Sequence, residues 1–270
     1  MTRHLNRLIP VLLAGTALTA PAGLGALELP TGGSVVHGTV GISQPSANQL
    51  SIQQSSQTAI VNWQGFSIGQ GGRVDISQPS ASSALLNRVT GSTPSTIAGQ
   101  LNANGQVYLI NPNGIAITPT GTVKAGAFVG SALDIADEDF KAGRRVFRGT
   151  GRSATVSNAG SIDVGRGGYA ALLGGQVENS GTISVPLGRV GLGAGEQATL
   201  DLSGDGFLQV AVPSRNDGST QALIRHSGRL GAAGGRVVMQ ATTARDAARN
   251  AINLSGIVEA RSVSGRSGAI

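Results

Sequence analysis

The sequence predicts an all-β fold, a right-handed parallel β-helix with an N-terminal cap and extra-helical β hairpins. Short apolar bursts bounded by Gly, Ser, Asn or Pro recur along the chain, and helical spacing is nowhere sustained. Glycine is abundant at 42 residues, whereas 3% of residues are aromatic and 13% are charged. This composition is typical of many short strands joined by tight turns. An internal repeat in the second half of the chain narrows the all-β class to a solenoid.

The repeat is a phrase that reads NAGSI at 158–162 and NSGTI at 179–183, and returns more loosely at 226–230 and 254–258. Its glycines at positions 160, 181, 228 and 256 are separated by 21, 47 and 28 residues. We interpret the unit as about 21 residues, enough for three short strands and three turns per coil, with 47 residues as two units plus a loop and 28 as one unit plus an insertion. The length of the mature chain then predicts about 11 or 12 coils, which form a rod about 55 Å long at about 4.8 Å per coil.

The N-terminal segment 1–26 is predicted to be a secretory signal peptide. Arg3 and Arg7 form a basic region, residues 8–20 form an apolar run too short to span a bilayer, and Ala22 or Ala26 marks a small-residue cleavage site. An uncleaved anchor is the alternative. Loss of the two Arg residues lowers the formal net charge from +6 to +4. Because the chain has no cysteine, its stability must come from burial and backbone pairing rather than disulfides.

Strands are predicted in order along the mature chain. They lie in bursts between 33 and 68, around 74–76, 84–86, 106–110 and 115–117, and as a pair over 123–133 broken at Gly126 and Gly130. Residues 27–63 are expected to cap the N-terminal end, because a stack of strands otherwise leaves an unpaired edge there. Trp63 and Phe66 are interpreted as a packing plug, with ligand stacking as the alternative.

The most charged segment, 134–145, is predicted to be a solvated loop or short helical turn that protrudes from the stack. The basic cluster that follows, 144–148, is also explained by a solvated loop. Nucleic-acid binding would require a dense basic face with interleaved aromatic residues, which the scattered Arg residues do not form.

The segment 105–117 reads as strand, turn and strand. Pro112 sets its own φ, and Asn113 and Gly114 tolerate positive φ, so Asn-Pro-Asn-Gly is a strong turn signal. The same residues carry a family resemblance. Asn87-Arg88-Val89, Gly99, Leu101 and the run 107–115, with LPTGG at 29–33 and VNWQGFSIG at 61–69, resemble the N-terminal secretion domain of two-partner secretion exoproteins. This is the filamentous haemagglutinin family, and the resemblance is strongest to its high-molecular-weight adhesin branch.

The resemblance implies a domain at 27–260 that is exported by the Sec machinery, recognised by a cognate outer-membrane β-barrel transporter, and able to nucleate β-helix folding. It implies a protein that is secreted or associated with the outer-membrane surface. The positions that match the family motif are Asn87, Arg88, Asn111, Pro112, Asn113 and Gly114, which serve either in recognition or as a structural turn. The chain departs from the family where the haemagglutinin branch carries a second Asn-Pro-Asn-Leu motif, because the comparable segment 77–83 reads SQPSASS.

Alternative functions are a stand-alone adhesin or carbohydrate-binding β-helix, with a host glycan or protein as receptor, or the stem of a contact-dependent toxin. Residues 261–270 look like the start of a further coil, which suggests that the chain is part of a longer exoprotein.

Catalytic chemistry finds little support in the sequence. It contains no Cys and no Gly-x-Ser-x-Gly, and His37 and His226 are interpreted as turn or surface residues. Polysaccharide lyases and hydrolases with this fold need clustered carboxylates or a Lys/Arg base, so the fold alone does not exclude an enzyme. The segment 201–206, DLSGDG, imitates the opening of a calcium loop but has Val212 at the twelfth position, so a β-turn is expected. We predict no enzyme activity, cofactor or metal.

Overall fold

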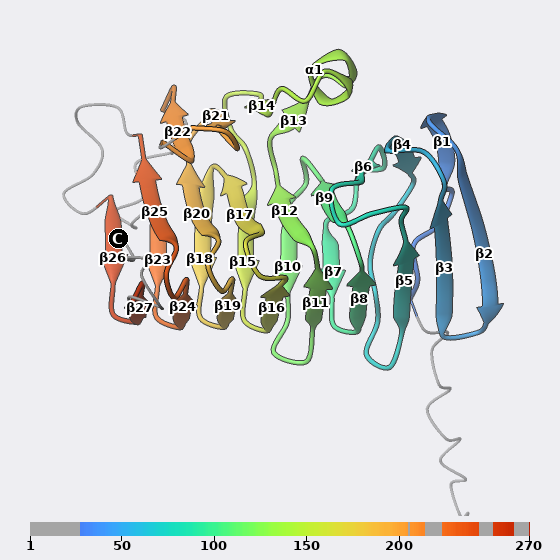
Figure 1. Cartoon of the computed structure of the whole chain (residues 1–270), viewed down its shortest axis with the longest axis horizontal. Helices are drawn as coiled ribbons and strands as arrows, with labels where there is room; N and C mark the ends of the chain where they lie inside the picture. Colours follow the sequence, from blue (N-terminus) through green and yellow to red (C-terminus); the bar gives the residue numbers. More distant parts are fainter. Residues whose placement is uncertain (1–27, 205, 214–222, 243–250, 262–269) are drawn as a thin grey trace, which may run out of the picture.

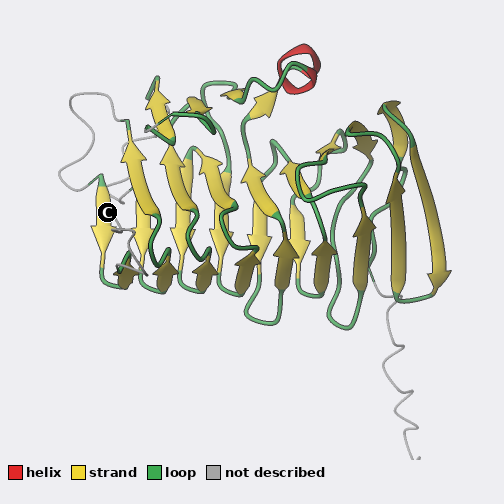
Figure 2. Ribbon diagram, viewed as in Figure 1, coloured by secondary structure: helices red, strands yellow, loops and turns green. Residues whose placement is uncertain are grey.

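A computed structural model shows a parallel β-helix built from three long sheets (Figures 1 and 2). The structure describes residues 28–204, 206–213, 223–242, 251–261 and 270; the predicted signal peptide lies outside this part. A complete coil contributes one strand to each sheet, so neighbouring strands of the coils come from successive turns of the chain and pair in parallel. This confirms the predicted fold class.

The first sheet has 8 strands, β1 (Ser34–His37), β4 (Thr58–Trp63), β6 (Ala84–Val89), β9 (Gln106–Ile110), β12 (Ala127–Ser131), β17 (Tyr169–Gly174), β20 (Arg189–Ala194) and β25 (Arg236–Ala241). The second has 6 strands, β7 (Ser95–Ile97), β10 (Ile115–Ile117), β15 (Thr155–Asn158), β18 (Gln176–Asn179), β23 (Ile224–His226) and β26 (Ile252–Leu254). The third has 9 strands, β2 (Val40–Ser46), β3 (Gln49–Gln54), β5 (Arg73–Ser77), β8 (Gln100–Ala103), β11 (Thr122–Ala125), β16 (Ser161–Val164), β19 (Thr182–Ser184), β24 (Arg229–Gly231) and β27 (Ile257–Glu259).

The cap is shorter than predicted. Strand β1 pairs antiparallel with β4, and β2 pairs antiparallel with β3, whereas β3 and β4 already pair in parallel with β5 and β6 of the next coil. The cap therefore ends before β3 rather than at Trp63. Strands β7 and β8 were missed because they hold few inward apolar residues, Ile97 in β7 and Leu101 and Ala103 in β8. The predicted break at Gly130 is wrong, since this glycine lies inside β12.

The predicted number of coils is also wrong. Asn179 of β18 is the direct register partner of His226 of β23, so the 47-residue spacing is one coil with a long insertion and not two coils. The first sheet has 8 strands, of which β1 belongs to the cap, leaving seven coils in the described part of that sheet. Its strands, spaced by about 4.8 Å, span about 34 Å. The insertions contain the residues that the predicted count had assigned to extra coils.

A fourth sheet stands outside the coils, as the predicted extra-helical hairpins require. It contains β13 (Asp134–Ile135), β14 (Val146–Arg148), β21 (Gln197–Leu200) and β22 (Leu208–Ala211), all antiparallel. The short helix α1 (Asp137–Lys141) connects β13 to β14 and projects beside them in Figure 1. The predicted protruding helical turn is thus confirmed. At five residues, α1 is far too short to cross a membrane, and no other helix occurs in the described ranges.

The molecule has two apolar cores. The main core fills the coils with stacked aliphatic side chains and includes Trp63 and Phe66, whose rings meet edge to face at 5.4 Å, so their packing role is confirmed. The second core lies between the outer face of the first sheet and the fourth sheet, and includes Tyr108, Phe140 and Phe147. The extra-helical segment, residues 134–148, therefore covers an apolar sheet face and is not only a solvated protrusion.

A row of polar side chains is buried at the C-terminal ends of three neighbouring strands of the second sheet, β15, β18 and β23. Asn158, Asn179 and His226 occupy equivalent positions on successive coils and are at most 1% exposed. The Asn158 amide donates to Asn179 Oδ1 at 2.7 Å, and Asn179 Nδ2 lies 3.0 Å from His226 Nδ1. The prediction of a surface position is therefore wrong for His226. His37 is exposed on β1, as predicted.

The segment at 201–204 forms a turn, as expected. Asp201 Oδ1 accepts hydrogen bonds from the backbone N–H groups of Ser203 and Gly204. These hydrogen bonds, with that of Gly204 the strongest, lower the pKa of the Asp201 carboxyl.

Candidate functional site

The Asn-Pro-Asn-Gly corner at 111–114 connects β9 to β10. The Gly114 N–H donates to the Asn111 carbonyl at 2.9 Å, and Gly114 has a φ of +108°, a conformation that L-residues with a side chain rarely adopt. Asn111 Oδ1 accepts from the Asn113 N–H at 2.9 Å, which makes an Asx turn. These contacts confirm the predicted strand, turn and strand.

The Asn111 side chain is completely buried. Its amide Nδ2 donates at 2.9 Å to the Thr93 carbonyl and at 2.9 Å to Ser95 Oγ, both on the preceding coil. Asn113 instead is exposed, and its Nδ2 donates to the Gly91 carbonyl at 2.9 Å. The corner is thus hydrogen-bonded to the corresponding corner of the preceding coil, and Pro112 and Asn113 form its outer surface.

Asn87 is the second buried asparagine of the motif positions. It lies on β6 opposite Leu109 of β9, is 0% exposed, and accepts a hydrogen bond from Trp63 Nε1 at 3.1 Å. Strand pairing therefore brings Asn87 and Asn111 to the same end of the first sheet on adjacent coils. Both side chains point into the coil interior, where each satisfies a neighbouring polar group.

Arg88, the next residue along β6, faces the opposite side of the sheet. Its guanidinium donates to Asp134 at 2.9 Å, to Asp137 at 2.6 Å and to the Ile135 carbonyl at 2.5 Å. Burial lowers the pKa of Arg88, but the two carboxylates outweigh burial and raise it overall. Arg88 therefore ties the start of the extra-helical segment to the coils, and the structure separates its role from that of Asn87.

The hydrogen bond between Trp63 and Asn87 gives a testable stability prediction. Trp63→Phe keeps an aromatic ring in the core but leaves Asn87 Oδ1 without this donor, so we expect a loss of about 1–3 kcal/mol of unfolding free energy. The double variant Trp63→Phe with Asn87→Leu should lose less than the sum of the single changes. Urea unfolding followed by circular dichroism measures both, and strict additivity would contradict the coupling.

Gln78 is a buried residue that sequence reasoning missed. It lies in the segment 77–83, where the second family motif is absent, and its Oε1 accepts from the Gly105 N–H at 3.0 Å. Its Nε2 donates to Gln54 Oε1 and to the Ser83 carbonyl, both at 3.0 Å. One glutamine thus joins three coils at this corner. A Gln before Pro in a turn-rich stretch carries no local signal of burial.

A buried guanidinium holds the extra-helical segment on the sheet. Arg145 is 8% exposed, donates to the Tyr108 hydroxyl at 2.8 Å and to the Phe140 carbonyl at 2.9 Å, and lies 4.9 Å from the centroid of the Tyr108 ring. The Tyr108 hydroxyl also bonds to that of Tyr169. Burial, and then the adjacent Tyr108, raise the pKa of Tyr169 well above its ordinary value. The interpretation of the whole 144–148 cluster as a solvated loop is therefore wrong for Arg145.

The cap, the parallel coils and the extra-helical sheet together define an exoprotein secretion domain, as solved structures show. The crystal structure of the HMW1 secretion domain from Haemophilus influenzae superposes with a TM-score of 0.77 and is 34% identical, covering 89% of this chain and 61% of that one. The filamentous hemagglutinin secretion domain, at 16% identity and a TM-score of 0.54 over 89% of this chain and 98% of that one, shares the fold. The higher similarity to HMW1 agrees with the predicted adhesin branch.

The chain belongs to the TPS secretion domain family, whose profile matches residues 28–270. It is the two-partner secretion domain of a secreted exoprotein of Gram-negative bacteria. A curated relative, the heme/hemopexin-binding protein of Haemophilus influenzae, is 31% identical over 262 residues. That alignment covers 94% of this chain and 28% of the relative, so the chain spans less than a third of the relative's length.

Proposed function

We propose that this domain is recognised in the periplasm by a cognate outer-membrane β-barrel transporter, after Sec export, and nucleates β-helix folding at the cell surface. The observation that carries the proposal is the burial of Asn87 and Asn111, which are both 0% exposed in the folded domain. A partner can contact these side chains only before the coils close over them. Recognition through these two asparagines therefore acts on the unfolded chain, and folding removes their side chains from the partner.

The antiparallel hairpin of β2 and β3 at the N-terminal end supports a role in nucleation. Strands β2 and β3 pair antiparallel across a short turn, so their contacts are local in sequence and cost little loop-closure entropy. Parallel pairing between coils brings together residues about 20 or more positions apart, as for Leu50 and Val74. A hairpin that forms early offers its free edge to β5, and each later coil adds to the one before it. The domain needs no catalytic group for this role, and we propose that it is not an enzyme.

The test compares two buried asparagines in cells that carry the cognate transporter. Asn111→Ala should abolish secretion, measured as exoprotein in the medium relative to the periplasm, while the purified domain still folds to a β-rich state. Asn158→Ala is the matched control, because Asn158 is also buried and bonded through its side chain but lies outside the family motif. We expect Asn158→Ala to destabilise the domain by about 1–3 kcal/mol and leave secretion largely intact.

Two outcomes would contradict the proposal. Normal export of Asn111→Ala would show that the motif is not needed for recognition. An equal secretion defect in Asn158→Ala would show that the motif acts only through folding. Surface association and binding of a host receptor, as in an adhesin, would follow from parts of the exoprotein other than this motif.

A further inference from the structure

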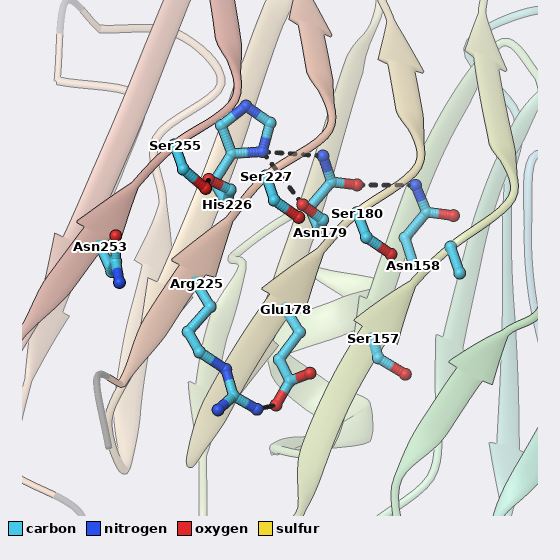
Figure 3. A pocket seen from close by; sticks show the side chains of 11 residues that line it. Ser157, Asn158, Glu178, Asn179, Ser180, Arg225, His226, Ser227, Asn253 and Ser255 are labelled. Carbon is cyan, nitrogen blue, oxygen red and sulfur yellow. Dashed lines mark hydrogen bonds and ion pairs between the residues drawn. The ribbon is translucent and has the colours of Figure 1, made fainter. Parts of the chain in front are cut away.

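A polar groove runs along the second sheet beside the buried Asn158, Asn179 and His226 row (Figure 3). The groove has a volume of ≈ 370 Å³ and extends over four successive coils. Neither the corner at 111–114 nor the extra-helical segment contributes to its lining. It is therefore separate from the residues that the secretion role uses.

Two rows of side chains form the walls of the groove. One row lies on the outer face of the strands, where Glu178 is in register with Arg225 and Arg225 with Asn253. The other row lies at the turn that follows each strand and consists of Ser180, Ser227 and Ser255. Because each row repeats once per coil, equivalent polar groups are spaced by about 4.8 Å along the helix axis.

Backbone hydrogen bonds join the coils along the groove, whereas part of its polar lining makes no side-chain hydrogen bond within the described residues. The backbone N–H of each turn serine donates to the carbonyl of the preceding coil, at 2.8 Å for Ser180 and 2.9 Å for Ser227. The hydroxyls of these two serines and the Asn253 amide make no side-chain hydrogen bond within the described part of the chain. Glu178 and Arg225 form an ion pair, so the opposite charges in the groove cancel.

We propose that this groove binds an extended neutral oligosaccharide along the helix axis. The coil repeat is close to the length of one sugar ring, so successive rings would meet equivalent groups on successive coils. Hydroxyl, amide, carboxylate and guanidinium groups together both donate to and accept from sugar hydroxyls. Cancellation of the Glu178 and Arg225 charges favours a neutral chain over a polyanion, which would require a surplus of positive charge.

Binding is tested with the purified protein and four probes, cellohexaose, maltohexaose and xylohexaose as neutral oligomers and oligogalacturonate as a polyanion, by isothermal titration calorimetry. At least one neutral oligomer should bind saturably at one site. Ser227→Phe places a ring in the groove and should weaken that binding by about tenfold or more. Asn253→Ala, which removes an amide without adding bulk, should weaken it less. Ser184→Phe, on the outer face of β19 in the third sheet, is the matched control and should bind as the parent does.

The absence of saturable binding by all three neutral oligomers would overturn the proposal. Unchanged binding by both Ser227→Phe and Asn253→Ala would also overturn it, as would binding of oligogalacturonate alone with loss in salt. Secretion of the groove variants is expected to be normal, so this test can fail while transporter recognition stands, and the reverse.

Discussion

Gly181→Ala is expected to lower the unfolding free energy by about 3 kcal/mol or more and Tm by about 6–12 °C. A Cβ atom at Gly181 would lie 2.1 Å from the Gly160 carbonyl oxygen of the preceding coil. Neither backbone can move easily, because the same Gly160 carbonyl accepts from the Thr182 N–H at 2.9 Å and Gly228 stacks on the other side of Gly181. Accommodating one methyl group would separate two coils.

Gly231→Ala is the matched control for this prediction. The nearest atom to a Cβ at Gly231 is the Ile183 carbonyl oxygen at 3.9 Å, and the position has no positive φ. We expect a change within about 0.5 kcal/mol. Thermal unfolding followed by far-ultraviolet circular dichroism measures both variants. Similar Tm values for the two would show that the glycine corners are not limited by contact between coils.

Arg145→Ala should also destabilise the domain strongly, by about 3 kcal/mol, because it removes three hydrogen bonds from a charged group and cation–π contacts with two buried rings. The guanidinium carbon lies 4.5 Å from the centroid of the Phe140 ring and the Nε atom donates to Tyr108, so one side chain joins α1 to the first sheet. Arg145→Lys should recover little, since an ammonium cannot reproduce the planar stacking and the directed hydrogen bonds of the guanidinium.

Arg144→Ala is the control for the adjacent position. The Arg144 side chain is 59% exposed and pairs with Asp139 at the surface, and exposed ion pairs contribute little to stability. Hydrogen exchange adds a local readout, because Arg145→Ala should raise the exchange of residues 133–148 more than that of the coils. Equal effects of the two Arg substitutions would contradict the role of Arg145 as the residue that holds the extra-helical segment.

The candidate site shows which features local sequence patterns can predict and which they cannot. The turn at 111–114 was predictable because Pro and Gly restrict or release φ by their own covalent structure. The direction of each side chain was not, because Asn87 and Arg88 are neighbours on one strand and point to opposite faces with different partners. Which of the two side chains faces the interior depends on the positions of the Trp63 ring and the Asp134 carboxylate, which belong to other parts of the chain.

The sequence by itself determined the β-helix, its repeating glycine corners and the strong turn, since these depend on short-range periodicity and backbone preference. Only the tertiary structure decided that 47 residues make one coil, that His226 continues a buried row of asparagines, and that Arg145 is enclosed while Arg144 is not. The physical reason is the same in each case. Burial and register depend on which distant segments cover a position, and an insertion in a solenoid leaves the pairing of its coils unchanged while it adds a new layer outside them.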